Sequence, residues 1–106
     1  MAGANDVRRI AVALEGTTSA PHFDRTAFKV RRIYATLGDR SVNLKLTPEE
    51  QEFKVLMAPE IFSPIPNAWG RQGWTIADVG AIGVAELEAV LRMAWEHGRA
   101  KAPKKR

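Results

Sequence analysis

The segment from Ser41 to Glu50 changes its hydrophobic period at its midpoint. Its first half alternates strictly and places three apolar side chains on one side of an extended chain: Val42, Leu44 and Leu46. A period of two is typical of a β-strand with one buried face. The second half, Thr47-Pro48-Glu49-Glu50, is typical of a helix start, because Thr47 and Glu50 can form a reciprocal capping box. A half-apolar strand that leads directly into a helix indicates helices packed against one face of a sheet.

Apolar residues at helical spacing predict a helix on either side of this segment. One has its apolar face at Val7, Ile10, Ala11 and Leu14, and the other at Leu87, Val90, Leu91, Ala94 and Trp95. The later helix is predicted from Val84 to about His97, with Gly98 as its stop. The central helix, from Pro48 to about Met57, is expected to point three large apolar residues inward: Phe53, Leu56 and Met57.

The region between the first two helices is predicted to be an antiparallel meander. Its β-forming segments are Ala27 to Val30, Ile33 to Leu37 and Ser41 to Leu46. Arg31 and Arg32 lie between the first two segments and are predicted to form a tight hairpin tip. The preceding stretch, Thr17 to Thr26, is polar and contains a proline, so we expect a loop there.

A last strand is predicted from Trp74 to Val79, with Trp74 and Ile76 facing the core near Leu44 and Val90. Two prolines and two glycines between Ile61 and Gly73 preclude a regular helix there and limit any strand to a sheet edge. The predicted order is α-β-β-β-α-β(β)-α. This order indicates an α+β fold with helices on one face of an antiparallel sheet.

The distribution of charge predicts a positive surface within the domain. The chain has 106 residues, room for one domain, which we expect to span residues 1–98. Its 16 basic and 12 acidic residues give a formal charge of +4, but five of the basic residues lie in residues 99–106. We expect residues 99–106 to be a basic tail, with Ala102 to Arg106 disordered. Within the domain, residues 25–45 hold six basic residues and one acid.

Several classes of protein are excluded by what the sequence lacks. The longest apolar run has five residues, far short of the ~20 that a membrane-spanning helix needs. The absence of cysteine excludes disulfides and thiolate metal sites. No glycine-rich phosphate loop or serine-nucleophile motif is present, and the two histidines lie 75 positions apart. The first nine residues also lack a secretory signal, so we expect a cytoplasmic protein. Because the motifs above are missing, we expect it to be non-enzymatic, with no catalytic residue, cofactor, metal or membrane partner.

The best candidates for function are basic and aromatic residues. Four cations lie on the solvent face or the tips of the predicted meander: Lys29, Arg31, Arg32 and Lys45. Three more candidates lie in the segment rich in proline and glycine: Trp69, Arg71 and Gln72. Lysine and arginine bind phosphates, and an exposed tryptophan stacks on bases. Both patterns also have a structural interpretation, since a tryptophan beside glycine is commonly a core anchor and a basic hairpin commonly resists edge pairing.

The chain resembles the MmcQ/YjbR family of small bacterial proteins from about Asp6 to Trp95. The residues that carry the resemblance are Ala13 to Thr18, Pro21 to Phe23, Phe28 to Val30, Ile33 to Leu37, Asn43 to Gln51 and, most specifically, Ala68 to Thr75. The resemblance implies a frataxin-like, double-wing α+β fold and DNA binding. Family members often have a glycine in the first hairpin, where this chain has Arg31-Arg32, and acids where it has Gly80 and Gly83.

Two functional hypotheses follow from these residues and the resemblance. The first is a non-enzymatic, monomeric DNA-binding module that uses the seven candidate residues named above. The alternative is a module that binds a protein or a small ligand through the aromatic segment from Trp69 to Trp74. A contiguous basic face without intervening acids would favour DNA, whereas an aromatic-lined cavity would favour a ligand. A frataxin-type iron site is disfavoured, because the first helix region has only two acids, Asp6 and Glu15.

Overall fold

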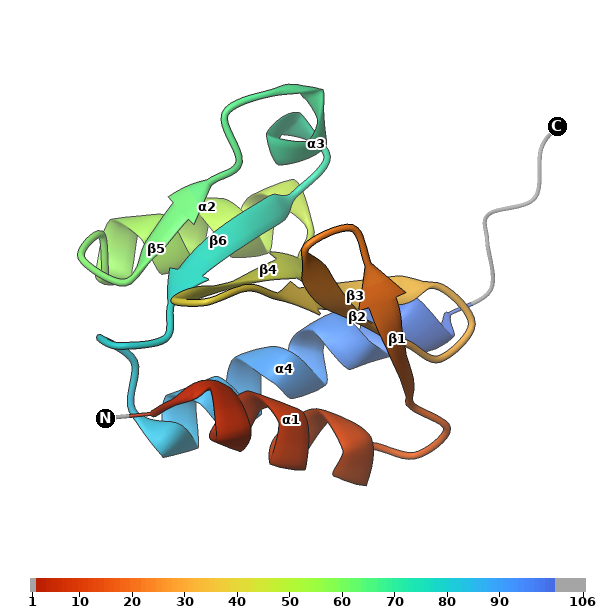
Figure 1. Cartoon of the computed structure of the whole chain (residues 1–106). Coiled ribbons are helices and arrows are strands. Elements are labelled where there is room, and N and C mark those ends of the chain that lie inside the picture. Colours follow the sequence, from red (N-terminus) through yellow and green to blue (C-terminus); the bar gives the residue numbers. More distant parts are fainter. Residues whose placement is uncertain (1, 101–106) are drawn as a thin grey trace, which may run out of the picture.

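A computed structural model describes residues 2–100 of the chain. The helices are α1 (Ala4–Ala13), α2 (Pro48–Met57), α3 (Ala68–Arg71) and α4 (Val84–Arg99). The strands are β1 (Thr18–His22), β2 (Arg25–Lys29), β3 (Ile33–Leu37), β4 (Ser41–Lys45), β5 (Phe62–Pro64) and β6 (Trp74–Asp78). The strands form one antiparallel sheet in the order β1-β2-β3-β4-β6-β5 (Figure 1). The predicted α+β class is confirmed.

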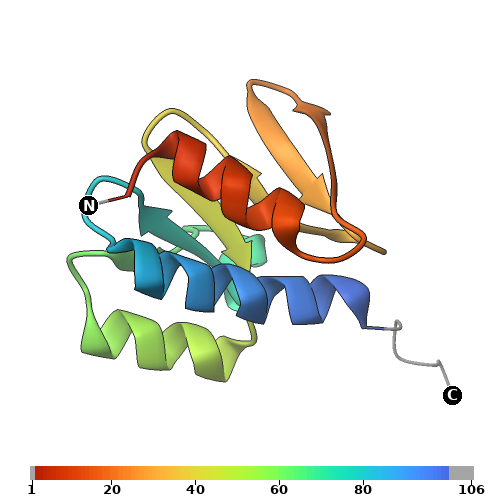
Figure 2. The same cartoon turned by 90° about the horizontal axis from the view of Figure 1, so that it is seen from below.

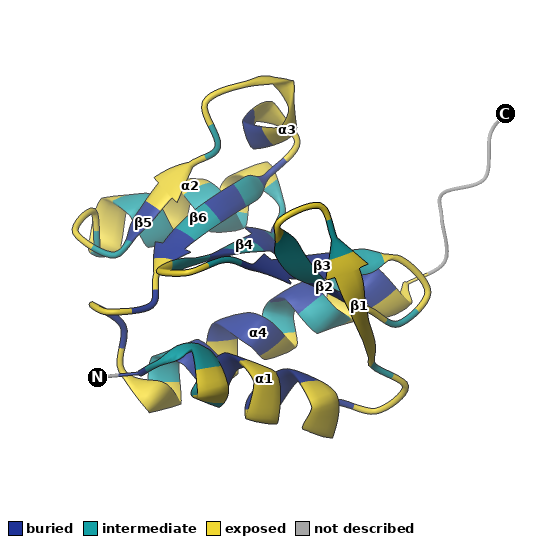
Figure 3. Ribbon diagram, viewed as in Figure 1, coloured by how far each residue is buried: buried dark blue, intermediate teal, exposed yellow. Residues whose placement is uncertain are grey.

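The three long helices cover the same face of the sheet. Figure 2 shows α1, α4 and α2 side by side in front of the strands. The core lies between these helices and the sheet, where Phe28, Tyr34, Leu44 and Leu87 are fully buried. Figure 3 shows the buried residues gathered where the sheet meets α1 and α4. Within residues 2–100, no helix is both long and apolar enough to cross a membrane.

The strand-to-helix junction has the predicted structure. Val42 and Leu44 of β4 are fully buried, while the residues that alternate with them along the strand are half-buried. At the start of α2, the Glu50 amide donates to Thr47 Oγ1 over 3.0 Å, and the Thr47 amide donates to Glu50 Oε1 over 2.9 Å. The capping box therefore satisfies two helix-end donors at the point where the chain leaves the sheet.

The predicted loop from Thr17 to Thr26 is wrong, because β1 and β2 form a hairpin there. Thr18 pairs with Lys29 and His22 with Arg25, and Phe23 closes the turn with a φ of 59°. Four of the five residues of β1 are exposed. An edge strand of this kind is held by backbone hydrogen bonds to one neighbour, so it carries no apolar alternation that the sequence could reveal.

The inward face predicted for α2 is also wrong. Phe53, Leu56 and Met57 are exposed, and α2 has no fully buried residue. The helix lies over the sheet edge formed by the three-residue strand β5, which offers little area to cover. Its contacts with the rest of the domain come from other side chains: Val55 packs against the core, and Lys54 pairs with Glu86 at 3.3 Å.

The predicted phase of the last strand is inverted. Thr75 and Ala77 are the fully buried residues of β6, whereas Trp74 and Ile76 are half-buried on the opposite face. Thr75 stands opposite Leu44 in the register, and directly opposed residues share a face of the sheet. The small residues therefore lie under the helices, and the large ones face away from them.

Gly98 does not stop α4, which continues to Arg99. A Cβ at Gly98 would lie 2.8 Å from the Tyr34 Cβ and 3.1 Å from the Arg32 carbonyl oxygen. Glycine is thus required here because the β2–β3 turn approaches the helix closely, not because the helix ends. The predicted disorder of Ala102 to Arg106 lies outside the described residues.

Candidate functional site

The sheet face opposite α1, α2 and α4 is hollowed into a groove of about 920 Å³. We call it the open-face groove. The β1–β2 hairpin flanks it on one side and α3 with β6 on the other, as their positions in Figure 1 show. Strands β3 and β4 contribute to its floor through Ile33, Thr36, Asn43 and Lys45. The β2–β3 turn and the end of α4 reach it through Arg31, Arg32 and His97.

The lining of the open-face groove is strongly basic. Its lysines and arginines are Arg25, Lys29, Arg31, Arg32 and Lys45. Asp24 is the one acid among the described residues that line it. Such a lining concentrates positive potential in a concave surface, which attracts anions.

Arg25 is held by the sheet. Its guanidinium donates to the Thr36 hydroxyl over 3.1 Å, to the Thr36 carbonyl over 2.9 Å and to the Ser41 carbonyl over 3.0 Å. Burial lowers the pKa of Arg25 from its ordinary value, and Asp24 opposes this shift. Because its Nε and one of its two terminal nitrogens are held by these oxygens, Arg25 contributes charge to the groove and connects β2, β3 and β4.

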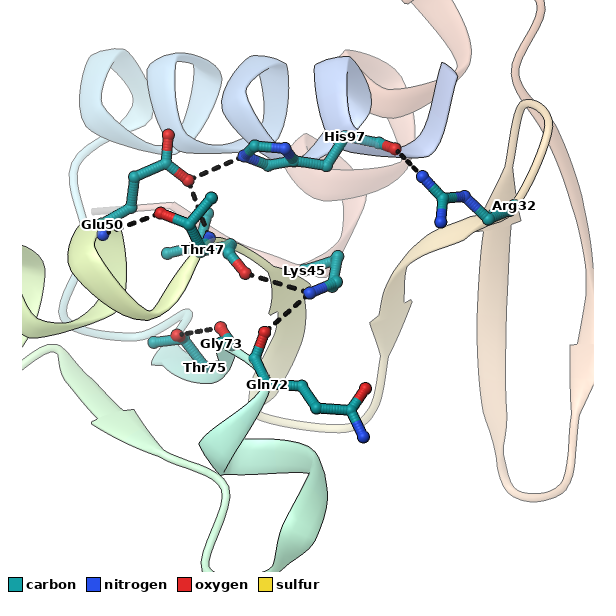
Figure 4. Close-up of polar contacts among 9 residues, drawn as sticks. Arg32, Lys45, Thr47, Glu50, Gln72, Gly73, Thr75 and His97 are labelled. Atoms are coloured by element: carbon teal, nitrogen blue, oxygen red, sulfur yellow. Dashed lines mark hydrogen bonds and ion pairs between the residues drawn. The ribbon is translucent and has the colours of Figure 1, made fainter. Parts of the chain in front are cut away.

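Arg32 binds the C-terminal end of α4. Figure 4 shows its guanidinium beside His97, where it donates to the His97 carbonyl over 3.0 Å; it also donates to the Ala100 carbonyl over 3.3 Å. The backbone amides of Arg31 and Arg32 both donate to the Gly98 carbonyl. Carbonyls in the last turn of a helix lack helical partners and carry partial negative charge. The β2–β3 turn therefore caps α4, a role that the sequence did not reveal.

Lys45 is fixed to the segment that follows α3. Its Nζ donates to the Gln72 carbonyl over 2.7 Å and to the Leu46 carbonyl over 3.3 Å (Figure 4). Burial and, next, the charge of Arg32 lower the pKa of Lys45, while Glu50 acts in the opposite direction. Arg32 and Lys45 therefore lie close enough for their charges to repel each other.

Lys29 and Arg31 are the available cations of the groove. Both side chains are exposed, and within residues 2–100 neither makes a hydrogen bond or an ion pair. The register of β2 against β3 shifts between Phe28 and Lys29, and a bulge of this kind re-aims the side chains near it. These two residues can bind an anion without breaking a contact of the fold.

Aromatic rings flank the basic floor. Trp69 on α3 is 57% exposed, and its ring meets that of half-buried Trp74 edge-on, with centroids 6.5 Å apart. Phe23 lies on the other side, at the turn of the β1–β2 hairpin. Phe23 is not among the predicted site residues, although its place beside Pro21 and Asp24 in a polar segment marks it as an apolar residue without a core partner.

The fold brings together six of the seven predicted site residues in the open-face groove: Lys29, Arg31, Arg32, Lys45, Trp69 and Gln72. Arg71 is exposed on α3 but lies outside the groove lining. The glycines of the Trp-Gly-Arg-Gln-Gly-Trp segment serve its close packing. A Cβ on Gly70 would collide with the Ile65 carbonyl, and one on Gly73 with the Leu46 carbonyl.

His97 and Glu50 form a polar pair at the groove margin. His97 Nε2 lies 2.7 Å from Glu50 Oε1 (Figure 4). Burial acts to raise the pKa of Glu50, but the Thr47 amide and His97 outweigh it and hold the pKa below its ordinary value. Within residues 2–100, no three His, Cys, Asp or Glu side chains lie together in a way that could hold a metal ion.

Comparisons with known proteins support the fold. A family model described as YjbR matches residues 12–97. The crystal structure of protein DR2400 from Deinococcus radiodurans, which has a DUF419 domain, is similar with a TM-score of 0.75. That similarity covers 90% of this chain and 77% of the other at 22% sequence identity. No curated protein matches the chain significantly.

Proposed function

The chain belongs to the YjbR family, and we propose that it is a non-enzymatic module that binds DNA in the open-face groove. The observation that carries the proposal is the gathering of five Lys and Arg residues with one acid in a single concave surface. These cations come from β2, the β2–β3 turn and β4, so the fold concentrates charge that the sequence distributes over twenty positions.

The available cations set the expected strength of binding. Lys29 and Arg31 can each neutralise a phosphate, whereas Arg25, Arg32 and Lys45 already donate to backbone carbonyls. Each phosphate contact contributes about −0.9 to the slope of log K against log salt for duplex DNA and about −0.7 for a single strand. Two contacts predict modest affinity with a clear salt dependence, to which the basic residues 101–106 add sequence-independent attraction.

Fluorescence anisotropy with labelled DNA at about 50 to about 200 mM salt tests the proposal. The test variant is the full chain with Lys29→Ala and Arg31→Ala. The matched control is Arg8→Ala with Arg92→Ala, which removes the same charge from exposed positions on α1 and α4. We expect the test variant to bind about tenfold or more weakly near 0.1 M salt, with a shallower salt slope, and the control to bind like the unchanged protein.

A third variant distinguishes the contribution of the groove to DNA affinity from that of the basic residues 101–106. It replaces Lys101, Lys104, Lys105 and Arg106 by alanine, and it should weaken binding uniformly across DNA sequences. The proposal is wrong if this variant loses all binding and the groove substitutions change nothing. DNA affinity would then be generic attraction to a polycation.

A small anionic ligand with an aromatic ring is the second candidate for the same groove. The observation that favours it is the exposed Trp69 ring, braced edge-on by Trp74 beside the basic floor. Pockets that bind small molecules combine apolar walls with a few polar groups in this way. Titration with a nucleoside monophosphate distinguishes the two, since saturation in the micromolar range without any DNA binding would favour the small ligand.

A further inference from the structure

We infer that the DNA bound in the open-face groove is single-stranded, with its bases stacked on Phe23 and Trp69 and its phosphates on Lys29 and Arg31. The inference rests on the proposed function and specifies its substrate. It depends on an exposed ring at a strained position, a rigidly held second ring and the presence of two free cations in the lining of the same groove.

Phe23 contributes nothing visible to folding. Its side chain is 94% exposed, and His22 is the one aromatic residue among residues 2–100 that its ring meets, edge-on with centroids 4.9 Å apart. Its φ of 59° lies in the left-handed region, where a bulky non-glycine residue is a genuine outlier. An aromatic residue held in a disfavoured conformation with its ring in solvent points to a role outside the fold. In the lining of a basic groove, that role is stacking on a base.

Trp69 is held in place by the segment around it. Its amide donates to the Asn67 side chain over 2.9 Å, which caps α3. Gln51 donates to the Gly70 carbonyl over 2.9 Å, and Gly70 packs directly against the Ile65 backbone. A ring on such a rigid support loses little freedom when a base stacks on it. Trp95, by contrast, donates its indole N–H to the Glu15 carbonyl and stabilises the fold.

The charges at the tip of the β1–β2 hairpin disfavour binding of a DNA duplex, because this tip is the part of the surface that could enter the major groove of DNA. A protruding β-ribbon reads the major groove when it carries donors and cations at its tip. The tip of the β1–β2 hairpin instead presents Phe23 and Asp24, and the guanidinium of Arg25 is turned back to Thr36. The free cations lie at the other end of β2, about 20 Å away at ~3.3 Å per residue.

A single strand in the groove matches this arrangement. Its unpaired bases can reach the rings of Phe23 and Trp69, while its phosphates reach Lys29 and Arg31. Stacking of this kind tolerates any base, because every base has a π-face. The ligand class is therefore single-stranded DNA with little sequence preference.

The informative variant is Phe23→Asn in the full chain. Asparagine populates the left-handed region far more readily than phenylalanine, so this variant should fold with equal or greater stability. Loss of a stacked base should nevertheless weaken binding by about 5- to 150-fold. A purely structural role of Phe23 would lower stability in this variant and leave binding unchanged.

The assay compares a labelled oligothymidine of about twelve nucleotides with a duplex of the same length at low salt. Trp69→Ala should weaken binding of the single strand by a similar factor and remove most of the tryptophan quenching that the oligothymidine causes. Phe53→Ala is the matched control, since it removes an equally exposed ring from α2 on the other side of the sheet. We expect the control to bind like the unchanged protein.

The outcomes separate this inference from the proposed function. Tighter binding of the single strand, lost in Phe23→Asn and Trp69→Ala but kept in Phe53→Ala, supports it. Equal or tighter binding of the duplex, or single-strand binding that neither ring substitution weakens, overturns it while DNA binding in the groove stands. Absence of binding to both DNAs overturns the proposed function and this inference together.

Discussion

Replacing Gly73 by alanine tests how the Trp-Gly-Arg-Gln-Gly-Trp segment is held against the sheet. Gly73 has a φ of 106°, which L side chains rarely adopt. A Cβ there would collide with the Leu46 carbonyl oxygen and lie 2.7 Å from the carbonyl carbon. Because the obstacle is backbone, no side-chain rotation can relieve it. The turn after α3 would have to move away from the start of α2.

The expected loss in the free energy of unfolding follows from the contacts that such a movement weakens. Backbone strain at a disfavoured φ costs about 1–3 kcal/mol. The Gly73 carbonyl accepts from the Leu46 amide and, over 2.8 Å, from the buried Thr75 hydroxyl, at about 1 kcal/mol each. The neighbouring Gln72 carbonyl accepts from Lys45 in a solvent-exposed contact, which contributes about 1 kcal/mol or less. With partial loss of each, Gly73→Ala should destabilise the domain by about 4 kcal/mol.

Equilibrium unfolding in urea measures this loss, and a slope of about 1.5–2 kcal/mol per molar would lower the midpoint by about 2–3 M. Gly80→Ala is the matched control. Its Cβ would meet only the Asp78 carboxylate at 3.4 Å, an ordinary contact, and its φ is not in the positive region. We expect the control to lie within about 0.5 kcal/mol of the unchanged protein. A loss below about 1 kcal/mol for Gly73→Ala, similar to the control, would refute the close approach.

Three further predictions concern stability. Arg32→Ala should destabilise by about 1 kcal/mol in urea unfolding, because the His97 and Ala100 carbonyls lose the Arg32 guanidinium while the backbone amides of the turn still bind Gly98. Arg31→Ala should stay within about 0.5 kcal/mol; equal effects would contradict the capping role of the Arg32 side chain. The pKa of Glu50 is held below its ordinary value of 4.5, so its contribution to the free energy of unfolding is complete above pH 4.5 and is lost as the pH falls through the folded-state pKa. Glu50→Gln should flatten the dependence of stability on pH in this range, and an unchanged dependence would contradict the prediction. Trp74→Ala should cost about 1–2 kcal/mol and Phe62→Ala about 3–5 kcal/mol in thermal unfolding; equal losses would place Trp74 in the core.

The β2–β3 turn connects the candidate site to the fold. Its two backbone amides and the Arg32 guanidinium bind the end of α4, while the Arg31 side chain makes no hydrogen bond or ion pair within residues 2–100. Adjacent arginines thus have different tasks, one in stability and one available for a phosphate. Family members often have a glycine in this hairpin, and the Arg32 guanidinium gives this chain a bond to the end of α4 that a glycine could not make.

Local sequence patterns are sufficient to predict the elements that depend on neighbours a few residues apart. The alternation of β4, the capping box of Thr47 and Glu50, and the apolar faces of α1 and α4 are all as predicted. These features follow from periods of 2 and 3.6 residues and from contacts between positions i and i+3. The most specific motif, Ala68 to Thr75, likewise identified the family, because its glycines permit a backbone approach that few sequences allow.

Which of the predicted site residues are free depends on contacts between distant segments of the chain. Lys29, Arg31, Arg32 and Lys45 are alike in sequence, yet two of them donate to carbonyls that lie far along the chain. The same holds for β6, whose inward face depends on its register against β4, and for Phe23, whose turn exists because β1 pairs with β2. A cation is occupied or available according to which backbone groups the fold brings within about 3 Å. That distance depends on packing between segments up to 68 positions apart, which no local period encodes.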